Sequence, residues 1–262
     1  MELANKKLFL LDMDGTIYLG NNLFKDTISF LNKIKEIGGM YLFLTNNSSK
    51  SSEAYVKKLR SLGIETKSDD YLTSTDVTIS YILSKHPGKK FYSVGTTSFN
   101  NQLISAGIPV TTEVEDDIFG VILSNDQELT FKKLDDASRI LTEKDAVYIA
   151  TNPDWVCPTE YGYVPDCGSF ADILKRATGK SPLFIGKPEP EMIFASLKKF
   201  GYEKEDAVMV GDRLYTDIAS GFNAGIDTVF VLSGEGTIED LAKSEIKPTY
   251  VMDSISNILE LL

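Results

Sequence analysis

The chain has 262 residues, of which 42% are hydrophobic and 25% are charged, values typical of a globular protein with one large domain or two smaller ones. Its formal net charge of -11 argues against nucleic acid and anionic membrane surfaces as partners, because so acidic a surface repels both. The first apolar run ends at Asp12 and is too short for a signal peptide, and no run could span a membrane, so we expect a cytoplasmic protein.

Cysteine and histidine are too scarce to carry the chemistry. In a cytoplasmic chain Cys157 and Cys167 are expected to be two thiols rather than a disulfide, and neither begins the Cys-x5-Arg loop of a cysteine phosphatase. The single histidine, His86, precedes Pro87 and is predicted in a loop, which argues against a histidine metal cluster and a Ser-His-Asp triad. Chemistry is therefore expected from carboxylates, hydroxyls, amides and lysine.

Apolar runs alternate with amphipathic helical patterns from end to end. This alternation predicts an α/β protein whose parallel sheet is covered by helices on both faces. In the first long helix, Ile28, Leu31, Ile34 and Ile37 are expected to form one apolar stripe. The strands are predicted at 7–12, 40–44, 90–94, 118–123, 145–150, 182–185, 206–210 and 227–232, and the helices at 25–37, 51–62, 76–85, 97–106, 130–142, 169–178, 190–199, 215–224 and 254–261.

The first strand is followed by two carboxylates, Asp12 and Asp14, with Gly15 and Thr16 directly after them. Reactive groups of an α/β sheet lie at the carboxyl ends of its strands, so both acids can converge on one metal ion and one substrate. A strand followed by an ordinary polar Asp-Gly turn is the alternative.

The second strand ends in Thr45, and Asn46, Asn47, Ser48 and Ser49 lead into the next helix. A hydroxyl and several amides at the start of a helix form a natural anion site. The alternative is an ordinary helix cap made by Ser and Asn.

Lys187 follows the strand predicted at 182–185, and Pro188 and Glu189 open the next helix. A lysine at this carboxyl end can bring a positive charge to the centre of the sheet. A solvated lysine in a turn is the alternative reading.

Asp212 follows the strand predicted at 206–210, and Asp217 falls in the first turn of the helix after it. Asp212 repeats the pattern of a carboxylate just past a buried strand. For Asp217, capping of the helix alone is the alternative, because a carboxylate suits the positive end of the helix dipole.

These strand ends together supply acids, a hydroxyl and a cation. Oxygen ligands without histidine or thiol suit Mg²⁺, and a carboxylate beside Mg²⁺ stays ionised and can act as a nucleophile. The combination is that of phosphoryl transfer.

The motifs Asp12-x-Asp14-Gly15-Thr16, Thr45, Lys187-Pro188 and Gly211-Asp212 with Asp217 occur in the order seen in the haloacid dehalogenase superfamily, which this chain therefore resembles. The finer resemblance is to its NagD-like, or p-nitrophenyl phosphatase, branch. The resemblance implies a Rossmann-like parallel-sheet core with an inserted smaller α/β cap domain. The core would comprise residues 1–78 and 182–262, and the cap residues 79–181.

The resemblance also implies roles for the residues at the motifs. Asp12 resembles the nucleophile that forms an aspartyl-phosphate. Asp14 resembles the general acid that protonates the leaving oxygen and then the base that activates water. Thr45, Lys187 and neighbouring amides would hold the phosphoryl oxygens, and Asn46 would contact the phosphate or link core to cap.

A Mg²⁺ ion would be held by Asp12, the backbone carbonyl of Asp14, and Asp212. Asp217 would orient the waters of the metal, or Lys187, without binding the ion itself.

The function expected from these motifs is Mg²⁺-dependent hydrolysis of phosphate monoesters of small metabolites, such as sugar, acid-sugar or nucleotide phosphates, with p-nitrophenyl phosphate as an artificial substrate. A phosphotransferase or phosphomutase that uses the same aspartate, and a binding module without turnover, are the alternatives. The sequence carries no signal of the natural substrate or of the oligomeric state.

Overall fold

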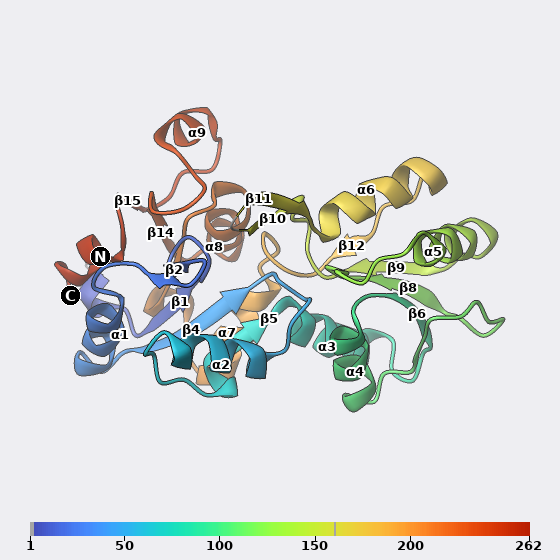
Figure 1. The fold of residues 1–262 in the computed structure, drawn as a ribbon. Coiled ribbons are helices and arrows are strands. Elements are labelled where there is room, and N and C mark those ends of the chain that lie inside the picture. The colour runs from blue at the N-terminus through green and yellow to red at the C-terminus, as the bar shows by residue number, and fades with distance from the viewer. Residues whose placement is uncertain (1–2, 160) are drawn as a thin grey trace. The chain divides into compact units, whose positions relative to one another are not determined.

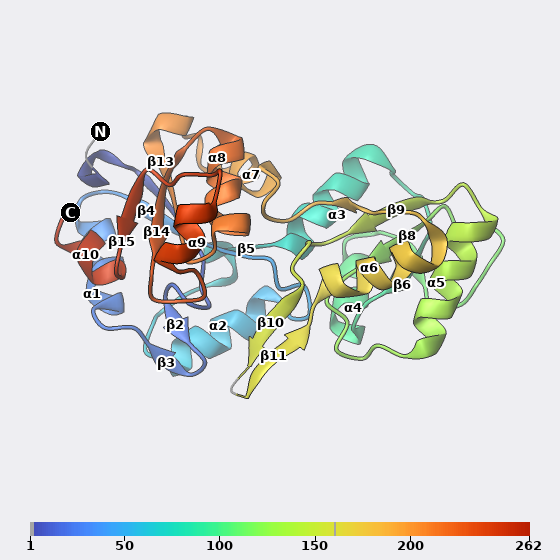
Figure 2. The same cartoon turned by 90° about the horizontal axis from the view of Figure 1, so that it is seen from above.

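The computed structural model describes residues 3–159 and 161–262, whose elements are drawn in Figures 1 and 2. Contacts within the chain divide it into two units. Unit 1 comprises Met1–Thr45, Ser52–Leu72 and Lys187–Leu262, and unit 2 comprises Asn46–Ser51 and Thr73–Gly186. Each unit has its own sheet of parallel strand pairs, so the predicted α/β class is confirmed with two sheets.

The sheet of unit 1 has six strands in the order β15-β14-β13-β1-β4-β5. The central strand β1 pairs in parallel with β13 and β4, so that Leu8 lies opposite both Ala207 and Met40. The strands are β1 (Leu8–Leu11), β4 (Met40–Thr45), β5 (Tyr71–Thr73), β13 (Ala207–Gly211), β14 (Asp227–Val231) and β15 (Tyr250–Met252).

The other elements of unit 1 surround this sheet (Figure 1). The helices are α1 (Thr27–Glu36), α2 (Ser52–Ser61), α7 (Glu191–Phe200), α8 (Ala219–Ala224), α9 (Ile238–Lys243) and α10 (Ile255–Leu259), with the π-helical segment η4 (Leu214–Ile218) before α8. The short elements are the hairpin β2 (Tyr18–Leu19) and β3 (Asn22–Leu23) and the 3-10 turns η1 (Leu3–Asn5), η2 (Ser68–Asp70) and η3 (Lys204–Asp206).

Both faces of β1 are buried, which is why its sequence is apolar without interruption. Phe9 and Leu11 belong to a core shared with α1, α2 and α10. In α1 the buried face holds Phe30, Leu31 and Ile34, whereas Ile28 is 46% exposed, so the prediction that Ile28 belongs to the stripe was wrong. Phe30 and Ile34, four residues apart, lie on the buried face of the helix, and Ile28, two residues before Phe30, lies away from that face.

The sheet of unit 2 has five strands in the order β12-β9-β8-β6-β7, and every neighbouring pair is parallel. Helices α5 and α6 pack on one face over Tyr92, Val121 and Tyr148. The strands are β6 (Phe91–Val94), β7 (Val110–Thr111), β8 (Gly120–Leu123), β9 (Val147–Ala150) and β12 (Leu183–Phe184), the separate antiparallel hairpin is β10 (Val156–Thr159) with β11 (Gly162–Pro165), and the helices are α3 (Ser74–Lys85), α4 (Thr97–Ser105), α5 (Phe131–Glu143) and α6 (Cys167–Thr178).

One strand lies in a different sheet from the one the sequence suggested. The strand predicted at 182–185 is β12, and it pairs with β9 at the edge of the sheet of unit 2. Contacts divide the chain after residues 72 and 186, whereas the prediction set the limits after 78 and 181. The assignment of a core and a cap to these regions stays a prediction.

Three smaller expectations concern the cysteines, the membrane and His86. Cys157 and Cys167 form no disulfide, as expected for two thiols. None of the helices described for residues 3–159 and 161–262 is both long enough and apolar enough to cross a bilayer. His86 follows the last residue of α3 in a turn, with its ring 5.1 Å from the ring of Phe119.

Candidate active site

The centre of the site in unit 1 is a group of three carboxylates at the ends of β1 and β13. These strands are parallel neighbours, so Asp12 and Asp212, each just past its strand, lie side by side. Asp217 joins them from η4. One carboxylate oxygen from each residue lies within 4.8 Å of the others, and no second group of three His, Cys, Asp or Glu ligands was found in the described part of the chain.

A single ammonium group holds two of these carboxylates. Lys187 Nζ lies 2.6 Å from Asp12 Oδ1 and 2.6 Å from Asp217 Oδ1, and it also donates to the carbonyl of Leu44 at 3.3 Å. The lysine side chain is 2% exposed. It starts the last segment of unit 1, directly after unit 2 ends at Gly186, rather than following a strand of this sheet as predicted.

The charges in this group do not balance. When all three carboxylates are ionised they face one ammonium, which leaves two negative charges in a buried place. Burial and the neighbouring charge of Asp217 raise the pKa of Asp12 well above its usual range, although Lys187 opposes the change. The same two causes raise the pKa of Asp212 to about 7. Burial alone would lower the pKa of Lys187, but Asp12 and Asp217 outweigh it and raise that pKa.

The three carboxylates fit a divalent cation. They offer only oxygen atoms, which are the ligands of Mg²⁺ and Ca²⁺, and their two excess charges are those that such an ion would balance. Both oxygens of Asp217 already have partners, because Oδ1 contacts Lys187 and Oδ2 accepts the N–H of Arg213 at 3.1 Å. Asp217 is thus held by Lys187 and the backbone of Arg213, in line with a residue that orients Lys187.

Asp212 is enclosed by a loop that the sequence reasoning missed. The N–H of Glu235 donates to Asp212 Oδ2 at 2.7 Å, and Thr16 Oγ1 donates to Oδ1 at 3.4 Å. A Cβ atom at either Gly15 or Gly234 would collide with Oδ2, so both positions require glycine, and Gly15 also has a positive φ of 94°. A signal existed, because the segment 233–236 follows the predicted strand 227–232 as the other motifs follow theirs.

Asp14 lies in the same unit but has a different environment. Its side chain is 39% exposed. Tyr18 OH donates to Asp14 Oδ2 at 3.0 Å, and Lys58 Nζ lies 3.7 Å from Oδ1. Burial, followed by the charge of Asp14, raises the pKa of Tyr18, so this hydroxyl stays protonated. Neither Tyr18 nor Lys58 was selected from the sequence.

Thr45 and Asn46, adjacent in the sequence, fall in different units. Thr45 is the last residue of β4, next to the carbonyl of Leu44 that Lys187 contacts, and it is buried. Asn46 belongs to unit 2, where its carbonyl accepts the hydroxyl of Ser74 at 2.7 Å. The structure thus brings Asp12, Lys187, Asp212 and Asp217 together, with Asp14 and Thr45 in the same unit and Asn46 in the other.

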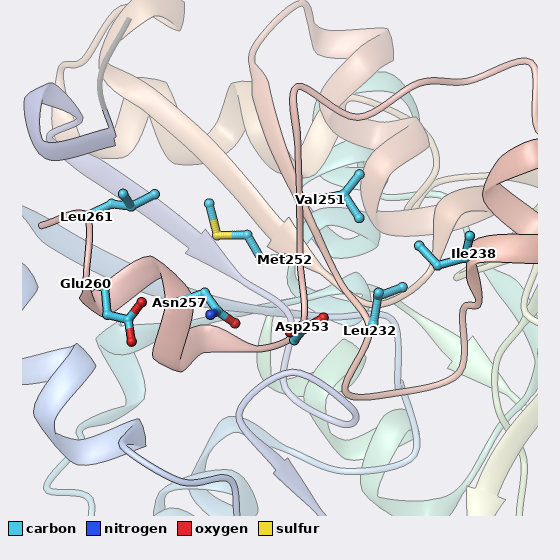
Figure 3. Close-up of a pocket in the computed structure, with 8 residues that line it drawn as sticks. All are labelled: Leu232, Ile238, Val251, Met252, Asp253, Asn257, Glu260 and Leu261. Carbon is cyan, nitrogen blue, oxygen red and sulfur yellow. The ribbon is translucent and has the colours of Figure 1, made fainter.

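A separate cavity of unit 1 does not suit a phosphate group. Figure 3 shows this space of about 430 Å³ near the ends of β14 and β15. Its apolar lining includes Leu232, Ile238 and Val251, and Asp253 and Glu260 add negative charge. No Lys or Arg is among its described lining residues, so an anion would meet repulsion without a counter-charge.

Two family models match the chain. The model described as haloacid dehalogenase-like hydrolase matches residues 9–109, and a HAD-hydrolase-like model matches residues 184–258. The first match contains Asp12, Asp14 and Thr45, and the second contains Lys187 and the segment from Asp212 onward.

Several characterised proteins are similar over nearly the whole chain. An acid sugar phosphatase of Staphylococcus aureus is 36% identical over 244 residues, which cover 93% of each sequence. The crystal structure of a 4-nitrophenylphosphatase from Thermotoga maritima has a TM-score of 0.92 and 38% identity, with 98% of both chains covered. A glycerol phosphate phosphatase from Mycobacterium tuberculosis, solved in complex with magnesium, has a TM-score of 0.91 and 27% identity over 98% of this chain and 78% of that one.

Proposed function

Because this chain belongs to the haloacid dehalogenase-like hydrolases, as a phosphatase of their NagD-like, p-nitrophenyl phosphatase branch, we propose that it hydrolyses phosphate monoesters of small metabolites with Mg²⁺ and through an aspartyl-phosphate. The names of the relatives support acid-sugar and glycerol phosphates as substrates, and we propose sugar and nucleotide phosphates beside them. p-Nitrophenyl phosphate would serve as an artificial substrate.

The juxtaposition of Asp12 with Lys187 and two further buried carboxylates carries this proposal. Asp12, Asp212 and the backbone carbonyl of Asp14 would hold the Mg²⁺ ion, and Asp217 would keep Lys187 in place. When bound, the ion supplies positive charge that offsets the two excess negative charges and the charge of the phosphoryl group. The relative solved with magnesium supports this choice of metal.

In the first step a carboxylate oxygen of Asp12 attacks phosphorus, and the bond between phosphorus and the ester oxygen breaks. Asp14 gives its proton to that oxygen, so the product leaves as a neutral alcohol. The position of Asp14 two residues after the nucleophile, with its side chain partly open to solvent, supports this role.

In the second step Asp14 takes a proton from water, and the water oxygen attacks phosphorus. The bond from phosphorus to Asp12 breaks, which releases inorganic phosphate, restores the Asp12 carboxylate and leaves Asp14 protonated for the next cycle. Lys187, Thr45 and Asn46 would bind the phosphoryl oxygens, where negative charge accumulates. Lys187 can do so because its ammonium already contacts the nucleophile.

Unit 1 would act as the catalytic core and unit 2, which contains the whole of the predicted cap 79–181, as the cap that selects the substrate. The cytoplasmic location also stays part of the proposal. The assignment of core and cap follows from family membership, and the location follows from the short first apolar run and the absence of a membrane-spanning run in the sequence.

Turnover of p-nitrophenyl phosphate tests the function. We expect phosphate release with Mg²⁺, almost none with EDTA, and a loss of about a thousandfold or more for Asp12→Asn, since the nucleophile is gone. Trapping of a phosphorylated wild-type chain, absent in Asp12→Asn, would identify the intermediate. Turnover that survives in Asp12→Asn would refute the mechanism, and phosphate transfer to added alcohols instead of water would favour the phosphotransferase alternative.

A further inference from the structure

The carboxylate of Asp14 is held at both oxygens by side chains from two different elements. Tyr18, in β2, donates its hydroxyl to Oδ2 at 3.0 Å. Lys58, on α2, places its ammonium 3.7 Å from Oδ1. The two partners also contact each other, because Lys58 Nζ lies 3.7 Å from the centroid of the Tyr18 ring, within the range of a cation–π interaction.

The loop between Asp14 and Tyr18 is folded so that this contact forms. The N–H of Gly15 donates to the carbonyl of Tyr18 at 2.8 Å, and the N–H groups of Ile17 and Tyr18 both donate to the carbonyl of Met13, at 2.8 and 3.2 Å. The Tyr18 ring is fully buried. A buried ring fixed by its own backbone gives the hydroxyl one position, and that position lies against Asp14.

Asp14 needs such support more than its neighbours do. Asp212 and Asp217 are enclosed by protein on all sides, whereas the side chain of Asp14 is 39% exposed. An exposed carboxylate in a turn would otherwise populate several rotamers, and only some of them direct an oxygen toward a bound ester.

We propose that Tyr18 and Lys58 are positioning residues that hold the Asp14 carboxyl in the orientation needed to protonate the leaving group. This inference rests on the proposed function, in which Asp14 is the general acid. Neither residue needs to touch the phosphoryl group, because both act through Asp14.

Two substrates whose leaving groups differ in their need for a proton make the positioning role of Tyr18 and Lys58 measurable. p-Nitrophenolate is a stable anion and departs without a proton, whereas phenolate is a poorer leaving group and gains more from the acid. Phenyl phosphate and p-nitrophenyl phosphate are otherwise similar in shape. The value of kcat/KM covers the steps up to departure of the leaving group, so its ratio between the two substrates reports on Asp14.

The test measures kcat/KM of the Mg²⁺-loaded enzyme on both substrates for Tyr18→Phe and Lys58→Met. We expect about a tenfold or larger loss on phenyl phosphate and a loss within about threefold on p-nitrophenyl phosphate, as general acid catalysis is worth about 10² to 10⁴. Lys58→Arg, which keeps a cation beside Asp14, should recover most of the rate on phenyl phosphate.

Two matched variants of unit 1 serve as controls. Tyr71→Phe removes another buried tyrosine hydroxyl, which lies 2.8 Å from Thr66 Oγ1. Lys35→Met removes another ammonium that lies over a ring, 5.0 Å from the centroid of Tyr41. Both should leave the ratio of the two substrates as in the wild type.

An equal loss on both substrates, or an unchanged rate on both, would overturn the positioning role while the proposed function stands. Failure of the function is recognised separately, because wild-type and Asp12→Asn proteins would then hydrolyse p-nitrophenyl phosphate alike. A thermal unfolding curve for each variant shows whether the fold is retained, and a fall in the phenyl phosphate rate alone cannot come from a loss of folded protein.

Discussion

The side chains at the carboxyl ends of the two parallel sheets are paired differently. At the carboxyl end of the six-stranded sheet, Asp12, Asp212 and Asp217 face one ammonium, that of Lys187, and two negative charges remain without a partner. Burial of unbalanced charge is costly, so this end of unit 1 is ready to bind a cation.

At the carboxyl end of the five-stranded sheet several polar groups bond to one another, although the buried Asn125 Nδ2 has no hydrogen-bond partner among the described residues. The hydroxyls of Ser48 and Thr151 lie 2.9 Å apart, and Asn152 Nδ2 donates to Asp154 Oδ2 at 2.9 Å and to Asp166 Oδ1 at 3.3 Å. Similar topology therefore carries the proposed reactive site in one sheet and a hydrogen-bonded network in the other. At the first end one ammonium contacts two carboxylates, whereas at the second the carboxylates of Asp154 and Asp166 share one amide.

Removing one lysine from each unit should show the largest difference between the two sheet ends. Lys187→Met should lower kcat/KM on p-nitrophenyl phosphate by about a thousandfold or more, because the phosphoryl charge loses its nearest cation. Lys133→Met removes the partner of the buried Asp126, 2.7 Å away, and should cost about 3 to 5 kcal/mol of unfolding free energy. Its kcat/KM should fall by less than about tenfold, as no charge of the catalytic group changes.

Steady-state kinetics and urea unfolding measure both quantities. The double variant Asp126→Asn/Lys133→Met removes both charges and should recover much of the stability. Comparable losses of activity at the two lysines would contradict the distinction between a reactive and a structural end.

The next largest difference between the two sheet ends should be their effect on the pH dependence of the unfolding free energy. The pKa of Asp212 is raised to about 7 in the folded protein, whereas an unfolded aspartate titrates near 4, so the folded state binds more protons between these values. The contribution of Asp212 to the stability of the metal-free protein should therefore be fully present below about pH 4 and be lost as pH rises through 7, by ~1.4 kcal/mol per pH unit between these values.

Urea unfolding in EDTA at pH 5 and pH 8 measures this change. Asp212→Asn should remove most of the dependence, while Asp166→Asn in unit 2 should not. A metal-free wild type that is more stable at pH 8 than at pH 5 would show that the carboxylates do not repel one another as inferred.

Mg²⁺ should stabilise the wild type by binding at the carboxyl end of the six-stranded sheet and not at that of the five-stranded sheet. At a concentration a hundred times its dissociation constant, a ligand that binds only the folded state adds about 2.7 kcal/mol. Thermal unfolding with and without Mg²⁺ should show this gain in the wild type and in Asp166→Asn, and a much smaller gain in Asp212→Asn. If Asp166→Asn abolished this gain in stability, the ion would bind at the five-stranded sheet instead.

The smallest difference concerns helix caps. Thr96 caps α4 in unit 2 by accepting the N–H of Phe99 at 3.1 Å, so Thr96→Ala should cost about 1 kcal/mol. Asp26, before α1 in unit 1, makes no side-chain cap bond and has a positive φ of 62°. Asp26→Gly should therefore raise the unfolding free energy, by up to about 1 kcal/mol. Urea unfolding measures both, and a loss of stability in Asp26→Gly would contradict the backbone argument.

Periodicity of apolar residues was sufficient to predict the strands that form the centre of each sheet. It missed β5, β7 and β15, because strands of two or three residues are too short to carry a pattern. The β10–β11 hairpin was also missed, since its second strand is largely exposed and has no apolar face. The sheet to which β12 belongs could not be predicted, because pairing depends on contacts far apart in the sequence.

The site was predictable where it follows directly from strand ends. Asp12 and Asp212 lie side by side because their strands are neighbours. The contacts of Tyr18 and Lys58 with Asp14 depend on how a loop folds and which face a helix presents, and no spacing in the sequence encodes them. The environment of Asp217 likewise comes from a π-helical segment where an ordinary helix was expected.

The six residues Asn46–Ser51 have a practical consequence for protein engineering. They are grouped with unit 2, where Ser48 bonds to the N–H of Asn125 and Thr96 donates to the carbonyl of Ser49. A chimera that exchanged only residues 73–186 with those of a relative would leave this hexapeptide facing a foreign sheet. If unit 2 selects the substrate as proposed, exchanging that preference between relatives requires two grafts, the long insert and the short peptide that precedes it.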